Sequence, residues 1–215
     1  MRINKIVNLI KPNSIIIDVG SDHAKVAIKS LTNKVAAFVY NIEINQAPLD
    51  NTIKNLNKFN LLNKTNNILN DGLKDLKIKD KIDYCIIAGM GGKNIINILS
   101  NKPKQLLIDS YILVPNNNAY LLRSYLKDND YKIQYEEIIK ESNHYYELIQ
   151  TSKHNGLKIS SDEDCYFGSY NLKHQNKSFT EYHKNNFNHI LNSKNHLVNK
   201  QKAKELELLK KVCKK

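Results

Sequence analysis

Short runs of β-branched and aromatic residues alternate with helical patterns along the first 150 positions of the chain. The runs that predict strands cover residues 14–19, 35–42, 65–69, 82–88, 110–114, 131–139 and 145–151. Between them, apolar residues recur at intervals of three and four, which predicts helices over 3–10, 24–31, 47–61, 94–99 and 119–126. This alternation is typical of an α/β fold with a mostly parallel, seven-stranded sheet covered on both faces. The last two runs have no helix between them and therefore predict an antiparallel hairpin.

The pattern changes after about residue 152. Residues 152–161 are polar, as expected of a linker, and from Ser178 onward a narrow apolar stripe recurs at three and four. The polar residues 192–195 are expected to break this stripe into two helices, which would pair as in a coiled coil. The sequence therefore predicts a sheet domain over 1–152 and a C-terminal α-helical coiled-coil hairpin over 153–215. The stripe consists of Phe179, Tyr182, Phe187, Ile190, Leu191, Leu197, Val198, Leu206, Leu209, Val212 and Cys213.

Composition limits the classes of protein to consider. Hydrophobic residues make up 41% of the 215 positions, enough for a sizeable core. No apolar run approaches the ~20 residues that span a bilayer, so no membrane segment is expected. The three cysteines, Cys85, Cys165 and Cys213, are far apart and form no C-x-x-C pair, which argues against a disulfide scaffold and a Cys-rich zinc site. These features favour a protein of the reducing cytoplasm.

The charge is unevenly placed. The chain carries 33 basic and 21 acidic residues, a net charge of +12, but nearly all the basic residues are lysines, a bias that an AT-rich coding sequence would produce by itself. Residues 1–150 hold 20 basic and 15 acidic side chains, whereas residues 151–215 hold 13 and 6. The C-terminal segment is therefore the basic end, and it is the part of the chain expected to meet an anionic partner such as nucleic acid.

Glycine is scarce, and its placement is informative. Five of the seven glycines stand at the C-terminal ends of predicted strands or in the turns just after them, at the edge of the sheet where α/β proteins bind ligands. A turn between a strand and a helix uses glycine for its backbone freedom, but the doubled glycine around Met90 exceeds what one turn requires. The five are Gly20, Gly72, Gly89, Gly91 and Gly92.

The first of these turns, 18–24, reads DVGSDHA. A dinucleotide-binding turn would place a second glycine where Asp22 stands, so a carboxylate occupies the position at which a phosphate would approach. This argues against NAD, FAD and ATP and favours S-adenosylmethionine, which has a cationic centre and an amino-acid head but no phosphate. Asp18 or Asp22 could accept its ammonium group, and Gly20 lets the backbone pass close to the ligand. His23 is interpreted as a helix-start residue without chemistry.

Two further loops extend this interpretation. Glu43 ends the second predicted strand, where a carboxylate can accept both hydroxyls of a ribose, a spacing that suits NAD and S-adenosylmethionine alike. Asn70, Asp71 and Gly72 follow the third strand; they form either a surface turn or the loop beside an adenine ring, with Asp71 accepting from the exocyclic amine.

The turns after the fourth and fifth strands are candidates for holding a substrate. The segment 88–92 reads AGMGG, whose backbone carbonyls could orient a base while Met90 offers a soft apolar surface. The segment 114–116 reads VPN, in which Pro115 fixes the backbone. Asn116 either binds a base edge or caps the helix that follows.

Taken in order and spacing, these blocks resemble the bacterial family of tRNA adenine N1-methyltransferases that act on position 22 of the tRNA. The resemblance covers residues 1–150, and DVGSDHA together with AGMGG is specific to it. It implies a Rossmann-like class I methyltransferase fold, S-adenosylmethionine as cofactor, no metal, tRNA as partner, and a C-terminal coiled-coil domain. The residues that carry it are 18–24, Glu43 with Pro48, 71–73, 88–92, 114–116 with Arg123, and the YYEL of 145–148.

The site residues expected on these grounds fall into three groups. Cofactor binding is expected of Asp18, Gly20, Ser21, Asp22, Glu43, Ile44, Asn70, Asp71, Gly72, Ala88, Gly89 and Met90. Substrate positioning is expected of Met90, Gly91 and Asn116. RNA binding is expected of Arg123, Lys173, Lys177 and Lys184.

Two other functions compete with this one. A small-molecule methyltransferase would need no basic appendage, and a catalytically silent RNA-binding protein would not be expected to keep Asp18, Gly20 and Glu43. The protein is expected to be a monomer, although a narrow apolar stripe could also pair two chains.

Overall fold

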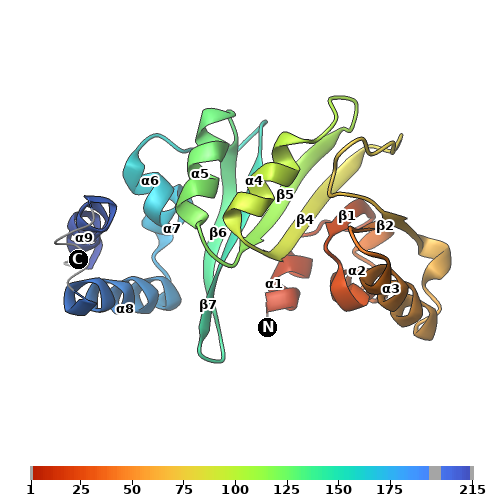
Figure 1. The fold of residues 1–215 in the computed structure, drawn as a ribbon, viewed down its shortest axis with the longest axis horizontal. Coiled ribbons are helices and arrows are strands. Elements are labelled where there is room, and N and C mark those ends of the chain that lie inside the picture. Colours follow the sequence, from red (N-terminus) through yellow and green to blue (C-terminus); the bar gives the residue numbers. More distant parts are fainter. Residues whose placement is uncertain (1, 194–199, 214–215) are drawn as a thin grey trace.

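The computed structural model describes residues 2–193 and 200–213. In these ranges the chain forms one eight-stranded sheet with the strand order β3-β2-β1-β4-β5-β7-β6-β8 (Figure 1). The first five strands in this order are parallel, and β7, β6 and β8 join them antiparallel. The strands are β1 (Ser14–Val19), β2 (Ala36–Glu43), β3 (Thr65–Leu69), β4 (Ile82–Met90), β5 (Ile108–Pro115), β6 (Lys132–Glu141), β7 (His144–Ser152) and β8 (Leu157–Lys158).

The seven expected strands and the terminal hairpin are confirmed, but the seven-stranded sheet is wrong by one strand. The eighth, β8, lies inside the segment 152–161 that was expected to be a linker. It has only two residues, too few to produce an alternating pattern, and Leu157 pairs with Ile133 of β6. Gly156 lets the two backbones approach, because a Cβ at this position would lie 2.5 Å from the carbonyl oxygen of Ile133.

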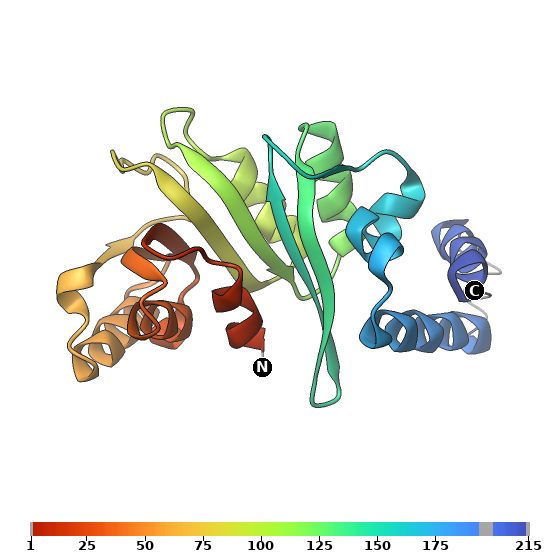
Figure 2. The same ribbon diagram turned by 180° about the vertical axis from the view of Figure 1, so that it is seen from behind.

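Helices cover both faces of the sheet, and two apolar clusters fill the space beneath them (Figure 1). One cluster joins the strands to α4 (Gly92–Ser100) and α5 (Ala119–Asp128). The other joins them to α1 (Arg2–Asn8), α2 (Lys25–Thr32) and α3 (Gln46–Lys58), the side seen in Figure 2. Successive side chains of β1 point to opposite faces of the sheet, so Ile17 belongs to the first cluster and Ile16 to the second. Short 3-10 helices occupy η1 (Asp22–Ala24) and η2 (Leu62–Lys64).

Four helices follow the sheet and lie at its β6–β8 end, away from β3 (Figure 1). They are α6 (Asp162–Phe167), α7 (Ser169–His174), α8 (Lys177–Ser193) and α9 (Lys200–Cys213). A capping box between Ser161 and Asp164 begins α6. Leu197 and Val198 lie outside the described residues. So does the second half of the break expected at 192–195.

The apolar residues of α8 and α9 pack on other parts of the chain as well as on each other. Phe179 and Ile190 of α8 and Leu209 of α9 share one buried cluster with Phe167 of α6 and Ile138 of β6. The stripe therefore joins the C-terminal helices to the edge of the sheet. Within the described ranges, no helix has the length and apolar character required to cross a membrane.

A candidate cofactor cavity and a neighbouring tyrosine cavity

A cavity of about 330 Å³, called here the central cavity, opens at the carboxyl ends of β1, β2 and β4. Strand order reverses direction around β1, so the crossovers on its two sides diverge and leave space for a ligand. The lining residues come from the strand ends, the loop after β3 and the outward face of α4. They are Val19, Gly20, Ile42, Glu43, Ile44, Asp71, Gly72, Met90, Asn94, Asn97 and Ile98.

Glu43 is held in place at the wall of the central cavity. Its side chain is buried, and Oε1 accepts a hydrogen bond of 2.9 Å from the hydroxyl of Ser21. The Ser21 oxygen lies 3.2 Å from Oγ1 of Thr52 in α3, so a short polar chain fixes the carboxylate. The backbone N–H of Asn70 donates to the Glu43 carbonyl, which ties the loop after β3 to the end of β2. Ser21 is therefore placed to orient Glu43.

Asp18 stands at the end of β1, next to the lining residues Val19 and Gly20, and does not itself line the cavity. Its carboxyl group is buried, and Oδ2 has no hydrogen-bond partner in the part of the chain that the structure describes. Burial, and secondly the charge of Glu43, raise the pKa of Asp18 to about 7. An unpartnered buried carboxyl group is costly to fold, and a cation bound near it would relieve that cost.

The backbone forms part of the cavity wall at Gly20, where φ is +73°. A Cβ added at this position would clash with Cε of Met90, the end of a flexible side chain that lines the same cavity. The Gly20 N–H donates to the carbonyl of Ile42 at 2.9 Å, so the turn after β1 is fixed against the end of β2. Glycine adopts this left-handed φ without the strain that a side chain would add, and a larger residue would also displace the Met90 methyl group.

The turns after β4 and β5 form one hydrogen-bonded unit. The N–H of Asn116 donates to the Met90 carbonyl at 2.8 Å, and its side-chain Nδ2 donates to the Gly89 carbonyl at 2.7 Å. The N–H of Gly92 donates to the Asn117 carbonyl at 2.9 Å. Asn116 thus holds the two turns together.

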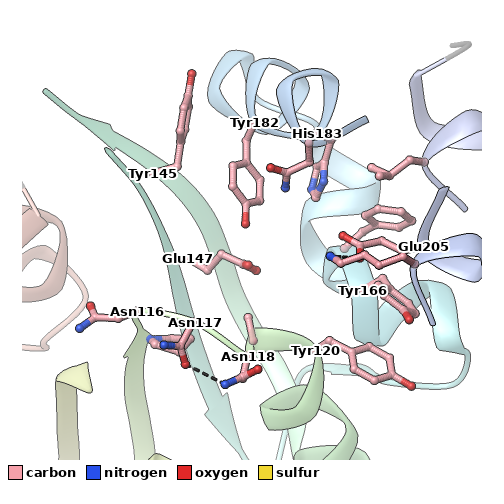
Figure 3. A pocket seen from close by; sticks show the side chains of 16 residues that line it. Asn116, Asn117, Asn118, Tyr120, Tyr145, Glu147, Tyr166, Tyr182, His183 and Glu205 are labelled. Atoms are coloured by element: carbon pink, nitrogen blue, oxygen red, sulfur yellow. Dashed lines mark hydrogen bonds and ion pairs between the residues drawn. The ribbon is translucent and has the colours of Figure 1, made fainter. Parts of the chain in front are cut away.

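A second cavity of about 220 Å³, called here the tyrosine cavity, lies on the other side of this unit (Figure 3). The turn after β5, strand β7 and the helices α6, α8 and α9 all contribute to its walls. Asn116 lines it, whereas Met90, hydrogen-bonded to Asn116, lines the central cavity. The residues are Pro115, Asn116, Asn117, Asn118, Ala119, Tyr120, Tyr145, Glu147, Tyr166, Phe167, Tyr182, His183, Asn186, Lys202, Glu205 and Leu209.

Arg123 was expected to bind RNA, and the structure contradicts this. Its side chain is fully buried. Its Nε donates to Glu136 and its Nη2 to Glu147, both at 2.6 Å, while Nη1 reaches the carbonyl of Cys165 at 3.4 Å. Arg123 therefore joins α5 to β6, β7 and α6 and has no free group to offer to a phosphate.

The other expected site residues are distributed as follows. Gly20, Glu43, Ile44, Asp71, Gly72 and Met90 line the central cavity. Asp18, Ser21, Asn70, Ala88 and Gly89 lie near it without lining it. Gly91 adjoins the tyrosine cavity, which Asn116 lines. Lys173, Lys177 and Lys184 are exposed on α7 and α8. The side chain of Asp22 lies outside the described residues.

Sequence reasoning missed the contribution of α4 to the central cavity. Asn94, Asn97 and Ile98 are spaced so that they share one face of that helix, and the polar pair in an otherwise apolar segment was a usable signal. Among the side chains that the structure describes, no group of three or more His, Cys, Asp or Glu is arranged to hold a metal ion.

The model of the family described as tRNA (adenine(22)-N(1))-methyltransferase, TrmK, matches residues 16–215. The chain belongs to this family. The TrmK family was the one indicated by the DVGSDHA and AGMGG segments, and that prediction is confirmed.

Relatives of TrmK type match along nearly the whole chain. The tRNA (adenine(22)-N(1))-methyltransferase of Bacillus subtilis (strain 168) is 28% identical, over 98% of this chain and 95% of the relative. M. capricolum TrmK, solved in complex with S-adenosyl-homocysteine, is 30% identical with a TM-score of 0.88, over 100% of this chain and 97% of that one. Streptococcus pneumoniae Sp1610, solved in complex with S-adenosyl-L-methionine, is 25% identical with a TM-score of 0.88, over 99% and 98% of the two chains. The fold of this TrmK family member is thus a Rossmann-like α/β methyltransferase fold.

Proposed function

We propose that the central cavity holds S-adenosylmethionine and that the turns after β4 and β5 present the target adenine to it. As a member of its family, the protein is a tRNA (adenine(22)-N1)-methyltransferase that uses this cofactor. The observation that carries the placement is the position of Glu43 in the cavity wall at the switch point of the sheet. In the neighbouring strand β1, Asp18 is buried, and its Oδ2 has no hydrogen-bond partner among the described residues.

The residues of the central cavity fit this cofactor. Glu43 keeps its second carboxylate oxygen, Oε2, without a hydrogen bond in the described structure, so it can accept from ribose hydroxyls. Ile44, which is 61% exposed, and Ile98 offer apolar surface to an adenine ring, while Asp71 can accept from its amine. Asp18 supplies negative charge near a cofactor with a positive sulfonium and ammonium group.

Catalysis then rests on alignment. The cofactor supplies an electrophilic methyl group, and N1 of adenine already carries a free lone pair at neutral pH, so the protein needs no general base. Met90 and the unit that Asn116 holds together separate the two cavities and set the distance between donor and acceptor. Fixing that approach is worth several orders of magnitude in rate.

We further propose that residues 153–215 hold the tRNA and residues 1–152 hold the cofactor. Lys173, Lys177 and Lys184 are exposed on α7 and α8, at the end of the molecule where basic residues are in excess. Such lysines bind phosphates without reading sequence. In this proposal the protein acts as a cytoplasmic monomer, and the pairing of α8 with α9 is completed within one chain as a helical hairpin.

The pKa of Asp18 makes cofactor binding dependent on pH. Because burial holds the pKa at about 7, most Asp18 carboxyl groups are protonated at pH 5.5, and a bound cation favours the ionised form. The affinity for S-adenosylmethionine should therefore rise by about tenfold between roughly pH 5.5 and pH 7, below the range in which the cofactor's own amino group titrates. Isothermal titration calorimetry across this range measures the change.

Asp18→Asn is the control for this pH dependence, because the amide keeps the shape of the side chain but does not titrate. Its affinity should be nearly flat over the same range. A wild-type affinity without slope, or an equal slope in the variant, contradicts the assignment of Asp18.

Transfer of a labelled methyl group from S-adenosylmethionine to unmodified tRNA tests the function as a whole. Label is expected in the tRNA after incubation with the purified protein. No label with any tRNA that carries adenine at position 22 would overturn the proposal.

A further inference from the structure

The tyrosine cavity has no assigned occupant, although it lies directly beside the proposed site of transfer. Its walls come from both parts of the chain, and Figure 3 shows Tyr182 pointing from α8 into the same space that Glu147 enters from β7. Asn116 connects this space to the central cavity, because it lines the tyrosine cavity and binds the Met90 carbonyl. An occupant would therefore adjoin the transferred methyl group.

The charges around the cavity favour a cation or a strong hydrogen-bond donor. One guanidinium, that of Arg123, is shared by two carboxylates, Glu136 and Glu147. Glu136 is fully buried and also accepts from the Tyr170 N–H, whereas the Glu147 side chain is 15% exposed and lines the cavity. The surplus negative charge of this cluster is therefore presented at Glu147.

The remaining charged groups of the cavity do not cancel that charge. Lys202 and Glu205 form an ion pair of 2.7 Å with each other. His183 is buried, and burial together with the nearby positive charge of Arg123 lowers its pKa to about 3, so its ring is neutral at physiological pH. Its Nε2 has no hydrogen-bond partner among the residues that the structure describes.

Four tyrosines in the walls offer aromatic surface to a planar heterocycle. Tyr145 and Tyr182 lie with ring centroids 5.4 Å apart, and Tyr120 and Tyr166 lie 4.2 Å apart on the other side. Aromatic side chains of this kind hold a base that has left its stack, and polar groups then read its edge.

On the basis of the proposed function, we propose that the tyrosine cavity receives the target adenine and that Glu147 accepts a hydrogen bond from its exocyclic amino group. During transfer the N1 lone pair forms the new N–C bond while the C–S bond breaks and its electron pair stays on sulfur. The positive charge of the sulfonium thus passes to the N1–C6–N6 group of the adenine. Glu147 stands where that charge develops, and it stabilises the transition state more than the neutral substrate.

The same contact distinguishes adenine from guanine. Guanine carries a carbonyl oxygen at C6, so two acceptors would face each other where adenine places a donor. Arg123 contributes by fixing Oε2 of Glu147, which leaves Oε1 to the base. Arg123 is in this sense a positioning residue.

The test combines Glu147→Gln with a tRNA that carries purine riboside, which lacks the amine, at position 22. Glu147→Gln should lower kcat on normal tRNA by about tenfold to a hundredfold, the range for a hydrogen bond to a charged group. Purine at position 22 should slow the wild type by more than it slows Glu147→Gln. The loss of the amine makes N1 a poorer nucleophile with both enzymes, but only the wild type has the contact to lose. The Kd for S-adenosyl-homocysteine should not change, which a role in the cofactor cavity would not allow.

Glu137→Gln is the matched control, because Glu137 is an ion-paired carboxylate of the same hairpin that faces Lys5. It should leave kcat unchanged. If Glu147→Gln does not fold, Tyr182→Leu tests the inference instead. This variant should show a large loss of kcat/KM on tRNA and unchanged cofactor binding. Full activity in whichever of these two variants folds overturns the inference. So does a combined loss, for Glu147→Gln acting on purine tRNA, that equals the product of the two separate losses. A wild type that is inactive on all tRNA refutes the proposed function instead.

Discussion

Replacing Glu43 by alanine should weaken S-adenosylmethionine binding by roughly a hundredfold and abolish transfer at ordinary cofactor concentrations. The carboxylate is the buried acceptor at the cavity wall, and two hydrogen bonds from ribose hydroxyls to a charged acceptor contribute about 3 kcal/mol together. The change also breaks the hydrogen bond from Ser21 to Glu43 and leaves Thr52 as the partner of that hydroxyl. Removing the Glu43 charge should in addition lower the pKa of Asp18, because that charge is the second cause of its elevation.

Calorimetric titration with S-adenosylmethionine measures the loss. Glu137→Ala, which removes a carboxylate paired with Lys5 on the outer part of the sheet, is the control and should bind the cofactor like the wild type. Binding by Glu43→Ala within a factor of about three of the wild type, less than 1 kcal/mol, would show that the ribose lies elsewhere.

Gly92→Ala should cost about a hundredfold in kcat, because it forces apart the two turns that present the substrate. A Cβ at Gly92 would lie 2.6 Å from the carbonyl oxygen of Asn118 and 2.9 Å from that of Asn117. Both are backbone atoms of the turn just before α5, so no side chain can move aside. Overpacking of this kind also lowers the free energy of unfolding by about 1 to 3 kcal/mol.

Gly89→Ala separates this steric effect from backbone strain. Gly89 has φ of +82°, but no atom lies within 4 Å of a Cβ placed there. It should lose about 1 kcal/mol of stability from the left-handed conformation and much less activity than Gly92→Ala. Single-turnover transfer rates and thermal unfolding of both variants measure the difference. Equal losses of kcat in the two would contradict the role of the contact between the turns.

Local patterns were sufficient for most of the fold. The run Ser14–Val19 is β-branched apart from Ser14 and Asp18, and it is bounded by Asn13 and Gly20, so its limits could be read directly. The strand β8 could not be predicted in this way, because its two residues become a strand only through pairing with β6. The C-terminal stripe predicted the helices but not their contact with Ile138, which is set by how the segment returns to the sheet.

The two cavities differ in how far the sequence could predict them. The central cavity is formed largely by strand ends and by the loops that directly follow strands. The topology of the sheet therefore brings Gly20, Glu43 and Asp71 together. Arg123 was misassigned because a lone arginine in an amphipathic helix carries no sign of burial. Its partners, Glu136 and Glu147, lie 13 and 24 positions further on in different strands. The tyrosine cavity combines segments from β5 to α9, which no local pattern relates.

The most direct test of the central claim is nucleoside analysis of two tRNAs after reaction with the purified protein and S-adenosylmethionine. One is an unmodified tRNA with adenine at position 22, and the other is the same tRNA with guanine there. The protein should form 1-methyladenosine in the first and none in the second, with every other adenine unchanged. The absence of 1-methyladenosine from the first tRNA, or its formation in both, would contradict a methyltransferase directed to N1 of adenine 22.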